Sequence, residues 1–144
     1  MIRFAYTIVY VQDVSRSLQF YQNAFGLQTC FLHPSQTYGE LETGTTKLAF
    51  AAHGLAEGNL PGGYLPVDHK ANKPLGIEIA LMTDDVPAAV AQAVAAGASV
   101  VVHPSEKPWG QTVAYLRDPD GTLLEVCSPV QTKPQTGSTK DPSS

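Results

Sequence analysis

Residues 6–14, with the sequence YTIVYVQDV, are matched by residues 78–86, with the sequence EIALMTDDV. Each segment reads as an apolar strand that runs into an Asp-Val dipeptide, where a helix can begin. The second segment starts at residue 78 and the first at residue 6, an offset of 72 that is half of the 144-residue chain. Repetition at a large fixed offset is typical of a duplicated supersecondary unit. The sequence therefore predicts two similar halves.

The first half is predicted to be a strand, a helix and three more strands. Residues 4–11 are rich in the β-branched and aromatic types that favour strands. Leu18, Tyr21 and Phe25 recur at the spacing of one helix face, and Gly26 supplies a residue that can end the helix. Further strands are expected at about 28–33, 38–42 and 46–53.

The second half repeats this order. A strand is expected at 77–82, followed by a helix that Asp85 caps and Gly97 ends. The next strand is predicted at 98–103, and Pro104 begins a loop that extends to Gly110. Residues 111–117 and 122–127 are predicted to form a hairpin around Asp118-Pro119-Asp120-Gly121, which matches the residue preferences of a type I turn.

Two stretches lie outside the repeat. Residues 54–75 contain four glycines and three prolines, which is typical of a linker, and their length makes them a candidate loop lining a site. Residues 131–144 contain no large apolar side chain and are predicted to be a flexible tail. We therefore expect a single domain over 1–130, with one module at about 3–53 and the other at about 76–130.

Composition excludes several classes of protein. The net charge of −4 and nine scattered Lys and Arg residues leave no basic surface for nucleic acid. No apolar run has the length of a membrane span, and the first residues lack the pattern of a signal peptide. Two cysteines are too few for a disulfide framework. We expect a cytoplasmic protein with no nucleic-acid or membrane partner.

The order of these elements resembles the vicinal-oxygen-chelate superfamily, which contains glyoxalase I, bleomycin-resistance proteins and extradiol dioxygenases. The resemblance covers about residues 3–130 and rests on the strand-Asp-Val-helix opening, on Phe20-Tyr21 and Phe25-Gly26-Leu27, and on the final Asp118–Gly121 hairpin with its apolar-Glu-apolar strand. It implies an α+β fold, in which two βαβββ modules form a curved mixed sheet around a cavity. It also implies a homodimer, the common state of this superfamily.

In metal-dependent members of the superfamily, each module supplies one metal ligand from its first strand and one from its last. By resemblance these four positions fall on Tyr6, Ala49, Glu78 and Glu125. Ala49 has no donor atom, and Tyr6 could bind only as a phenolate, which its high normal pKa disfavours. Two carboxylates are a poor cage for a transition metal, although with waters they could hold Mg²⁺ loosely. We expect no cofactor, with a weakly held divalent metal ion at Glu78 and Glu125 as the alternative.

Glu78 and Glu125 are lone charges in apolar strands. Each could simply face water, or both could face a cavity and act as a general base or as acceptors for a cationic or hydroxylated ligand. Trp109, the single tryptophan, could stack on a ligand or could plug the core. The candidate ligand-binding residues are Tyr6, Tyr10, Trp109, Gln111 and Tyr115.

Three functions follow from the resemblance. The first is binding of a small organic molecule without a transition metal, as in the bleomycin-resistance branch. The second is a glyoxalase-type lyase or isomerase, in which Glu78 or Glu125 removes a proton next to a carbonyl group. The third, an extradiol dioxygenase, is the least favoured, because none of the four positions is a histidine.

Overall fold

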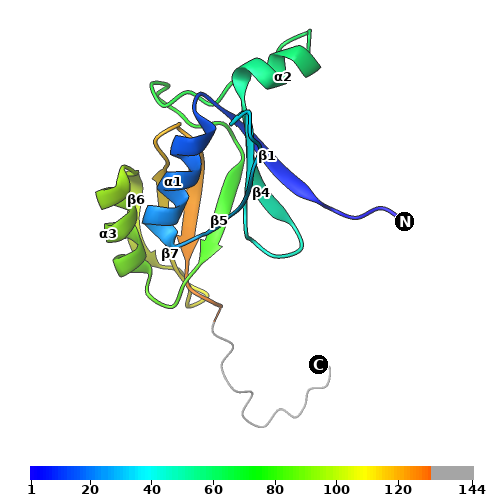
Figure 1. Ribbon diagram of the computed structural model, residues 1–144. Coiled ribbons are helices and arrows are strands. Elements are labelled where there is room, and N and C mark those ends of the chain that lie inside the picture. Colours follow the sequence, from blue (N-terminus) through cyan, green and yellow to red (C-terminus); the bar gives the residue numbers. More distant parts are fainter. Residues whose placement is uncertain (131–144) are drawn as a thin grey trace.

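Each half of the repeat folds into a helix packed on its own four-stranded sheet, as Figure 1 shows. This computed structural model describes residues 1–130, so the predicted flexible tail at 131–144 lies outside the described residues. The first module consists of β1 (Tyr6–Val11), α1 (Val14–Phe25), β2 (Thr29–Leu32), β3 (Tyr38–Leu41) and β4 (Lys47–Ala52). The second consists of β5 (Glu78–Met82), α3 (Val86–Ala96), β6 (Ser99–Glu106), β7 (Thr112–Arg117) and β8 (Leu123–Cys127), and α2 (His53–Asn59) lies between the modules.

The two sheets have the same topology. Their strand orders are β1-β4-β3-β2 and β5-β8-β7-β6, and in each sheet the first strand runs parallel to the last while the other pairs are antiparallel. Among residues 1–130 no ladder joins the two sheets, and neither sheet closes into a barrel. The predicted α+β fold with two βαβββ modules is confirmed.

The helices begin and end at the predicted residues. The Asp13 carboxylate accepts a hydrogen bond from the backbone N–H of Arg16 at 3.1 Å, and the Asp85 carboxylate accepts one from Ala88 at the same distance. Such side-chain caps satisfy N–H groups that have no partner within the helix. At the other end of α1, Gly26 has a φ of 71°, which a residue without Cβ adopts at little cost.

The core lies between the helices and one face of each sheet. α1 and α3 also lie side by side, so both modules contribute to one apolar cluster (Figure 1). Tyr21 stacks on Phe50 with ring centroids 5.3 Å apart, and both side chains are fully buried. Because Leu124 and Val126 also belong to this cluster, the residue between them must face away from the helices.

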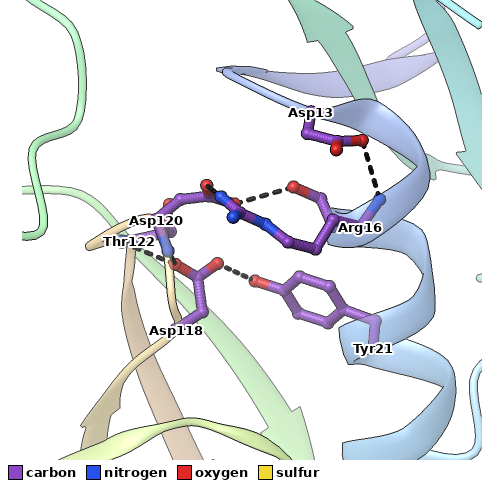
Figure 2. A network of polar contacts seen from close by, with 7 residues as sticks. Asp13, Arg16, Tyr21, Asp118, Asp120 and Thr122 are labelled. Atoms are coloured by element: carbon purple, nitrogen blue, oxygen red, sulfur yellow. Dashed lines mark hydrogen bonds and ion pairs between the residues drawn. The ribbon is translucent and has the colours of Figure 1, made fainter.

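The Asp118–Gly121 turn forms a polar junction between the two modules (Figure 2). The Tyr21 hydroxyl of α1 donates a hydrogen bond of 2.6 Å to the Asp118 carboxylate, although only 4% of Asp118 is exposed. The same carboxylate accepts the backbone N–H groups of Asp120 and Thr122 at 3.0 and 2.9 Å. One buried aspartate therefore holds the turn in shape and binds it to the helix of the other module.

A second contact lies at the edge of this junction. The Ser17 hydroxyl donates to the Asp120 carboxylate at 2.7 Å, and the Arg16 guanidinium lies 3.7 Å from the other oxygen of that carboxylate. The Arg16 side chain is largely exposed, so its ion pair contributes less than 1 kcal/mol, as is usual at a surface. The buried hydrogen bond of Tyr21 is the stronger link.

The segment between the modules differs from the sequence prediction in one respect. Residues 53–59 form the helix α2, whereas the glycines and prolines of 54–75 favoured a linker without regular structure. Beyond α2 the segment is irregular and is fastened to the second module by Arg117. The Arg117 guanidinium donates hydrogen bonds to the carbonyl oxygens of Asp68, Ala71 and Gly121 at 2.6–3.1 Å. The backbone at 68–69 passes so close to Gly121 that any Cβ at this position would lie 2.7 Å from it.

The strand β6 is also longer than predicted, because it continues through Pro104 to Glu106. Proline lacks the N–H group that a central strand needs, but β6 is the edge of its sheet and its register shifts between Val102 and Ser105. Both features tolerate proline, so the loop predicted from Pro104 begins only after Glu106. Within the described residues, no helix is both long enough and apolar enough to cross a membrane.

Candidate functional site

Glu78 and Glu125 lie close together on the face of the second sheet that the helices do not cover, which we call the helix-free face. Their strands β5 and β8 are parallel neighbours, with Glu78 paired to Leu123 and Ala80 paired to Glu125. The two glutamates are thus diagonal neighbours, and side chains at such positions are within reach of each other. Ile79, which follows Glu78, and Leu124, which precedes Glu125, pack on the core instead.

The two carboxyl groups compete for one proton. Hydrogen bonding to Glu125 raises the pKa of Glu78 to about 7, and partial burial and the negative charge of Glu125 act in the same direction. The Glu78 carboxyl group therefore holds its proton more tightly than an ordinary glutamate does. The pair can therefore present both a carboxylic acid, which donates a hydrogen bond, and a carboxylate, which accepts one.

Tyr115 and Cys127 flank this pair on the same face. Tyr115 is the cross-strand partner of Glu125, and Cys127 follows two residues later on β8. Burial raises the pKa of the Tyr115 phenol, and the charges of Glu125 and Glu78 raise it further. Burial, followed by the charge of Glu125, raises the pKa of the Cys127 thiol as well. Both groups remain protonated at neutral pH, so Tyr115 is a donor facing two acceptors, and Cys127 lacks the thiolate of a nucleophile.

Trp109 and Gln111 lie at the end of β8 that Cys127 occupies. The indole N–H of Trp109 donates to Gln111 Oε1 at 2.8 Å, and Gln111 Nε2 donates to the carbonyl oxygen of Ser128 at 2.8 Å. Trp109 is 58% exposed, so its side chain does not cover the hydrophobic core, which was the alternative to a ligand-binding role. Its ring is oriented by Gln111 and is open to a ligand or partner.

The other candidates, Tyr6 and Tyr10, belong to the first sheet. Both are on β1. Val9 and Val11, which alternate with them along the strand, pack into the core, so the two tyrosines share the helix-free face of that sheet. The strand β1 belongs to a different sheet from β5 and β8, which carry Glu78 and Glu125. The structure therefore brings Glu78, Glu125 and Tyr115 together, with Trp109 and Gln111 at one end of their sheet, and leaves Tyr6 and Tyr10 in the other module.

The described chain was then compared with known proteins. The family model described as "Glyoxalase/Bleomycin resistance protein/Dioxygenase superfamily" matches residues 3–126. The chain belongs to this superfamily. The comparison with curated proteins found no match. The glyoxalase superfamily resemblance drawn from the sequence is thus confirmed.

Several solved structures share the fold. A glyoxalase/bleomycin resistance protein/dioxygenase family enzyme from Burkholderia phytofirmans PsJN has a TM-score of 0.76 and 24% identity, over 90% of this chain and 100% of that one. A glyoxalase-related enzyme from Fulvimarina pelagi has a TM-score of 0.74 and 19% identity, over 90% and 89%. TioX from Micromonospora sp. ML1 has a TM-score of 0.65 and 21% identity, over 88% and 98%. At these identities the likeness shows the fold alone.

Strand register tests the alignment of the superfamily's metal positions onto this chain. Ala49 pairs with Ile8 in the first sheet, and Glu125 pairs with Ala80 in the second. Residues 8 and 80 are related by the repeat offset of 72, so Ala49 does occupy the place of Glu125. Tyr6 likewise occupies the place of Glu78. Tyr6 pairs with Lys47, two residues before Ala49, and Glu78 pairs with Leu123, two residues before Glu125.

These four positions do not fit a transition-metal site. Ala49 offers no donor atom, Tyr6 is a phenol, and the remaining two carboxylates compete for a proton. In the part of the chain that the structure describes, no group of three or more His, Cys, Asp or Glu side chains could hold a metal ion. The residues present therefore give no support for metal chemistry at this site. The absence of a cofactor remains a prediction.

Sequence reasoning missed a second tyrosine and glutamate pair, on the helix-free face of the first sheet. The Tyr38 hydroxyl donates to Glu40 Oε2 at 2.8 Å, and burial followed by this hydrogen bond raises the pKa of Tyr38. Glu40 pairs with Ala49 just as Tyr115 pairs with Glu125. The hydrogen-bonded tyrosine and glutamate of the first module thus sit on β3, whereas the superfamily's metal positions fall on β1 and β4.

Proposed function

We propose that this protein binds a small organic molecule on the helix-free face of the second sheet, with Glu78 and Glu125 as its polar anchor and without a tightly held transition metal. The observation that carries the proposal is the placement of the two glutamates as diagonal neighbours on this face. Like-charged groups are placed together on an apolar surface at a cost in stability, and natural sequences retain such costs mainly at functional sites. The apolar strands around the pair supply the rest of a binding surface.

The chemistry of the pair favours ligands that carry a hydroxyl or a cationic group. When both carboxyl groups are ionised, their combined charge attracts a cation such as an ammonium group. When one is protonated, the pair donates one hydrogen bond and accepts others, which suits a hydroxyl group. Tyr115 adds a further donor, and the exposed ring of Trp109 could stack on an aromatic part of the ligand.

A thermal-shift screen of hydrophobic cations and aromatic hydroxyl compounds tests this proposal. We expect compounds that raise the Tm of the wild-type protein to lose most of this effect in Glu125→Gln and in Glu78→Gln. Glu57→Gln, which changes an exposed glutamate on α2, is the matched control and should respond as the wild type does. Ligand shifts that survive in both site variants would exclude the carboxyl pair as the anchor.

A glyoxalase-type lyase or isomerase is the second candidate function. It is favoured by the pKa of Glu78, because a general base works best when its pKa lies near the operating pH. The base would remove a proton from the carbon next to a carbonyl group, and the same carboxyl group would return it to the neighbouring carbon. Exchange of such a proton for deuterium in D₂O, followed by NMR with and without added Mg²⁺, is the test. Exchange that is no faster than in Glu78→Gln would remove this candidate.

We further propose that residues 1–130 act as one domain, that the protein is a cytoplasmic homodimer, and that no nucleic acid or membrane takes part in its function. Support for the dimer comes from large apolar side chains that are exposed near the N-terminus and on the helix-free face of the second sheet: Ile2, Phe4 and Met82. Exposed apolar side chains that form one patch are typical of an interface. Light scattering after size-exclusion chromatography tests it, and a monomeric mass at 100 μM would count against it.

A further inference from the structure

A narrow apolar slot lies where the first strands of the two modules approach each other beneath the connecting segment. Its volume is about 210 Å³, and its walls are almost entirely apolar or aromatic, with Ile8, Tyr10, Tyr64, Ile77, Ile79 and Leu123 among them. An apolar cavity of about 150 Å³ is large enough to bind benzene. This slot could therefore hold a substituted or bicyclic aromatic ring.

The aromatic wall of the slot is held in place before any ligand arrives. Tyr64 packs against Tyr10 with ring centroids 4.8 Å apart and an angle of 58° between the rings. The Tyr64 hydroxyl lies 2.6 Å from His53 Nδ1, and the two rings are stacked. Arg117 fastens the same connecting segment four to seven residues further along, at Asp68 and Ala71. A preformed wall reduces the entropy that binding would otherwise cost.

The slot also has one polar residue with an unused hydroxyl group. Thr122 lines the slot and is 7% exposed. Among the described residues, its Oγ1 is the buried side-chain oxygen or nitrogen without a hydrogen-bond partner. A buried hydroxyl without a partner costs stability and requires an explanation, of which a missing ligand is one. The hydroxyl is fully buried as it stands, so a ligand in the slot would reach it only after the side chain rotates about its Cα–Cβ bond.

We propose that the slot binds the ring of an aromatic compound that carries a hydroxyl group, and that this hydroxyl is hydrogen-bonded to Thr122. The inference rests on the proposed function and names its ligand class. The two regions are adjacent, because Leu123 lines the slot and is also the cross-strand partner of Glu78. A ring bound in the slot would direct its substituents towards the carboxyl pair, so one ligand could use both regions.

Methyl NMR with 2-naphthol and naphthalene as probes tests this site. We expect both compounds to shift the methyl signals of Ile8, Ile79 and Leu123 and to show intermolecular NOEs to them. Thr122→Val should weaken 2-naphthol roughly three- to tenfold, the value of one hydrogen bond, and should leave naphthalene unchanged. Because the Thr122 hydroxyl has no partner in the protein, the variant should be at least as stable as the wild type.

A second variant addresses the slot itself. Ile77 is 73% exposed at the slot, so Ile77→Trp should fill it without disturbing the core and should weaken both probes at least tenfold. NOEs to other methyl groups, or equal affinities for Ile77→Trp and wild type, would overturn the slot as a ring site. Equal weakening of both probes by Thr122→Val would overturn the hydrogen bond.

The two proposals fail in different ways. Probe binding in the slot should persist in Glu125→Gln, since the ring contacts do not include this carboxylate. If the slot binds its probes while no ligand in the thermal-shift screen depends on Glu78 or Glu125, the proposed function is wrong and the slot stands. If ligands depend on the carboxyl pair but give no NOE to slot methyl groups, the slot is wrong and the proposed function stands.

Discussion

Replacement of Tyr21 by phenylalanine should reveal how strongly the polar junction holds the two modules together. The change removes only the hydroxyl that donates to Asp118 across 2.6 Å (Figure 2). Tyr21 is fully buried and Asp118 nearly so, which means that water cannot replace the lost donor without a rearrangement. The phenyl ring keeps its stacking contact with Phe50, so the apolar packing is preserved.

The expected loss follows from the state of Asp118 in the variant. A hydrogen bond to a charged group contributes about 1.5–3 kcal/mol, and Asp118 would retain the backbone donors of Asp120 and Thr122. We therefore expect Tyr21→Phe to lower the free energy of unfolding by about 2 kcal/mol. For a domain of this length, this corresponds to a fall in Tm of about 8 °C.

The loss should also depend on pH. Burial raises the pKa of Asp118, and the hydrogen bond from Tyr21 opposes this rise. Removal of the hydroxyl thus raises the pKa of Asp118 further in the folded state, while the pKa in the unfolded state is unchanged. When the pKa of Asp118 is higher in the folded state than in the unfolded state, the protein loses stability as the pH rises from the unfolded-state pKa to the folded-state pKa. The penalty of Tyr21→Phe should be smaller at pH 4 than at pH 7.

Urea denaturation followed by circular dichroism at both pH values measures these quantities. Tyr6→Phe is the matched control, because Tyr6 is half exposed and its hydroxyl has no hydrogen bond within the described residues, and it should change stability by less than about 0.5 kcal/mol. If Tyr21→Phe behaves as the control does, or if its penalty is larger at pH 4, the junction does not stabilise the protein in the way described.

Other predictions concern the carboxyl pair, the connecting segment, Trp109 and metal binding. The raised pKa of Glu78 means that the folded state binds the proton more tightly than the unfolded state, so stability should fall between about pH 4.5 and 7; this part of the pH profile should disappear in Glu78→Gln. Arg117→Ala should speed tryptic cleavage after Lys70, and a rate equal to that of the wild type would speak against the fastening role. Trp109→Ala should abolish the thermal shifts of ligands that depend on Glu78 and Glu125, whereas probes that bind only in the slot should be unaffected; retained shifts of the first group would remove this ring from the site. Protein purified with Ni²⁺, Zn²⁺ or Mn²⁺ should hold less than one ion per chain by mass spectrometry of metals, and a stoichiometric ion touching Glu78 would refute this.

The repeat in the sequence was sufficient to predict two similar halves and the order of their elements, and the superfamily resemblance supplied the fold. The caps Asp13 and Asp85 and the terminating residues Gly26 and Gly97 act at the predicted places. The α2 helix was missed because glycine and proline in 54–75 lower helix propensity, although five of the seven residues of α2 are neither. Local composition was a poor guide there.

The candidate site was only partly predictable. Strand alternation in an apolar sequence singled out Glu78 and Glu125, and register placed them next to each other. Tyr38 and Glu40 lie two residues apart on β3 and were missed because the superfamily resemblance points to the first and last strands of each module. The slot was beyond sequence reasoning, since it depends on how the segment after α2 crosses between the modules. Contacts between residues far apart in the chain leave no periodic signal.

The protonation of Glu78 tests the central claim most directly. The side-chain carboxyl carbon of Glu78 can be followed by ¹³C NMR as a function of pH, in the wild type and in Glu125→Gln. We predict a midpoint of about 7 in the wild type, and a shift towards the ordinary value of about 4.3 when Glu125 becomes a neutral amide. A wild-type midpoint near the ordinary value, unchanged by Glu125→Gln, would show that the two carboxyl groups share no proton and would contradict the account.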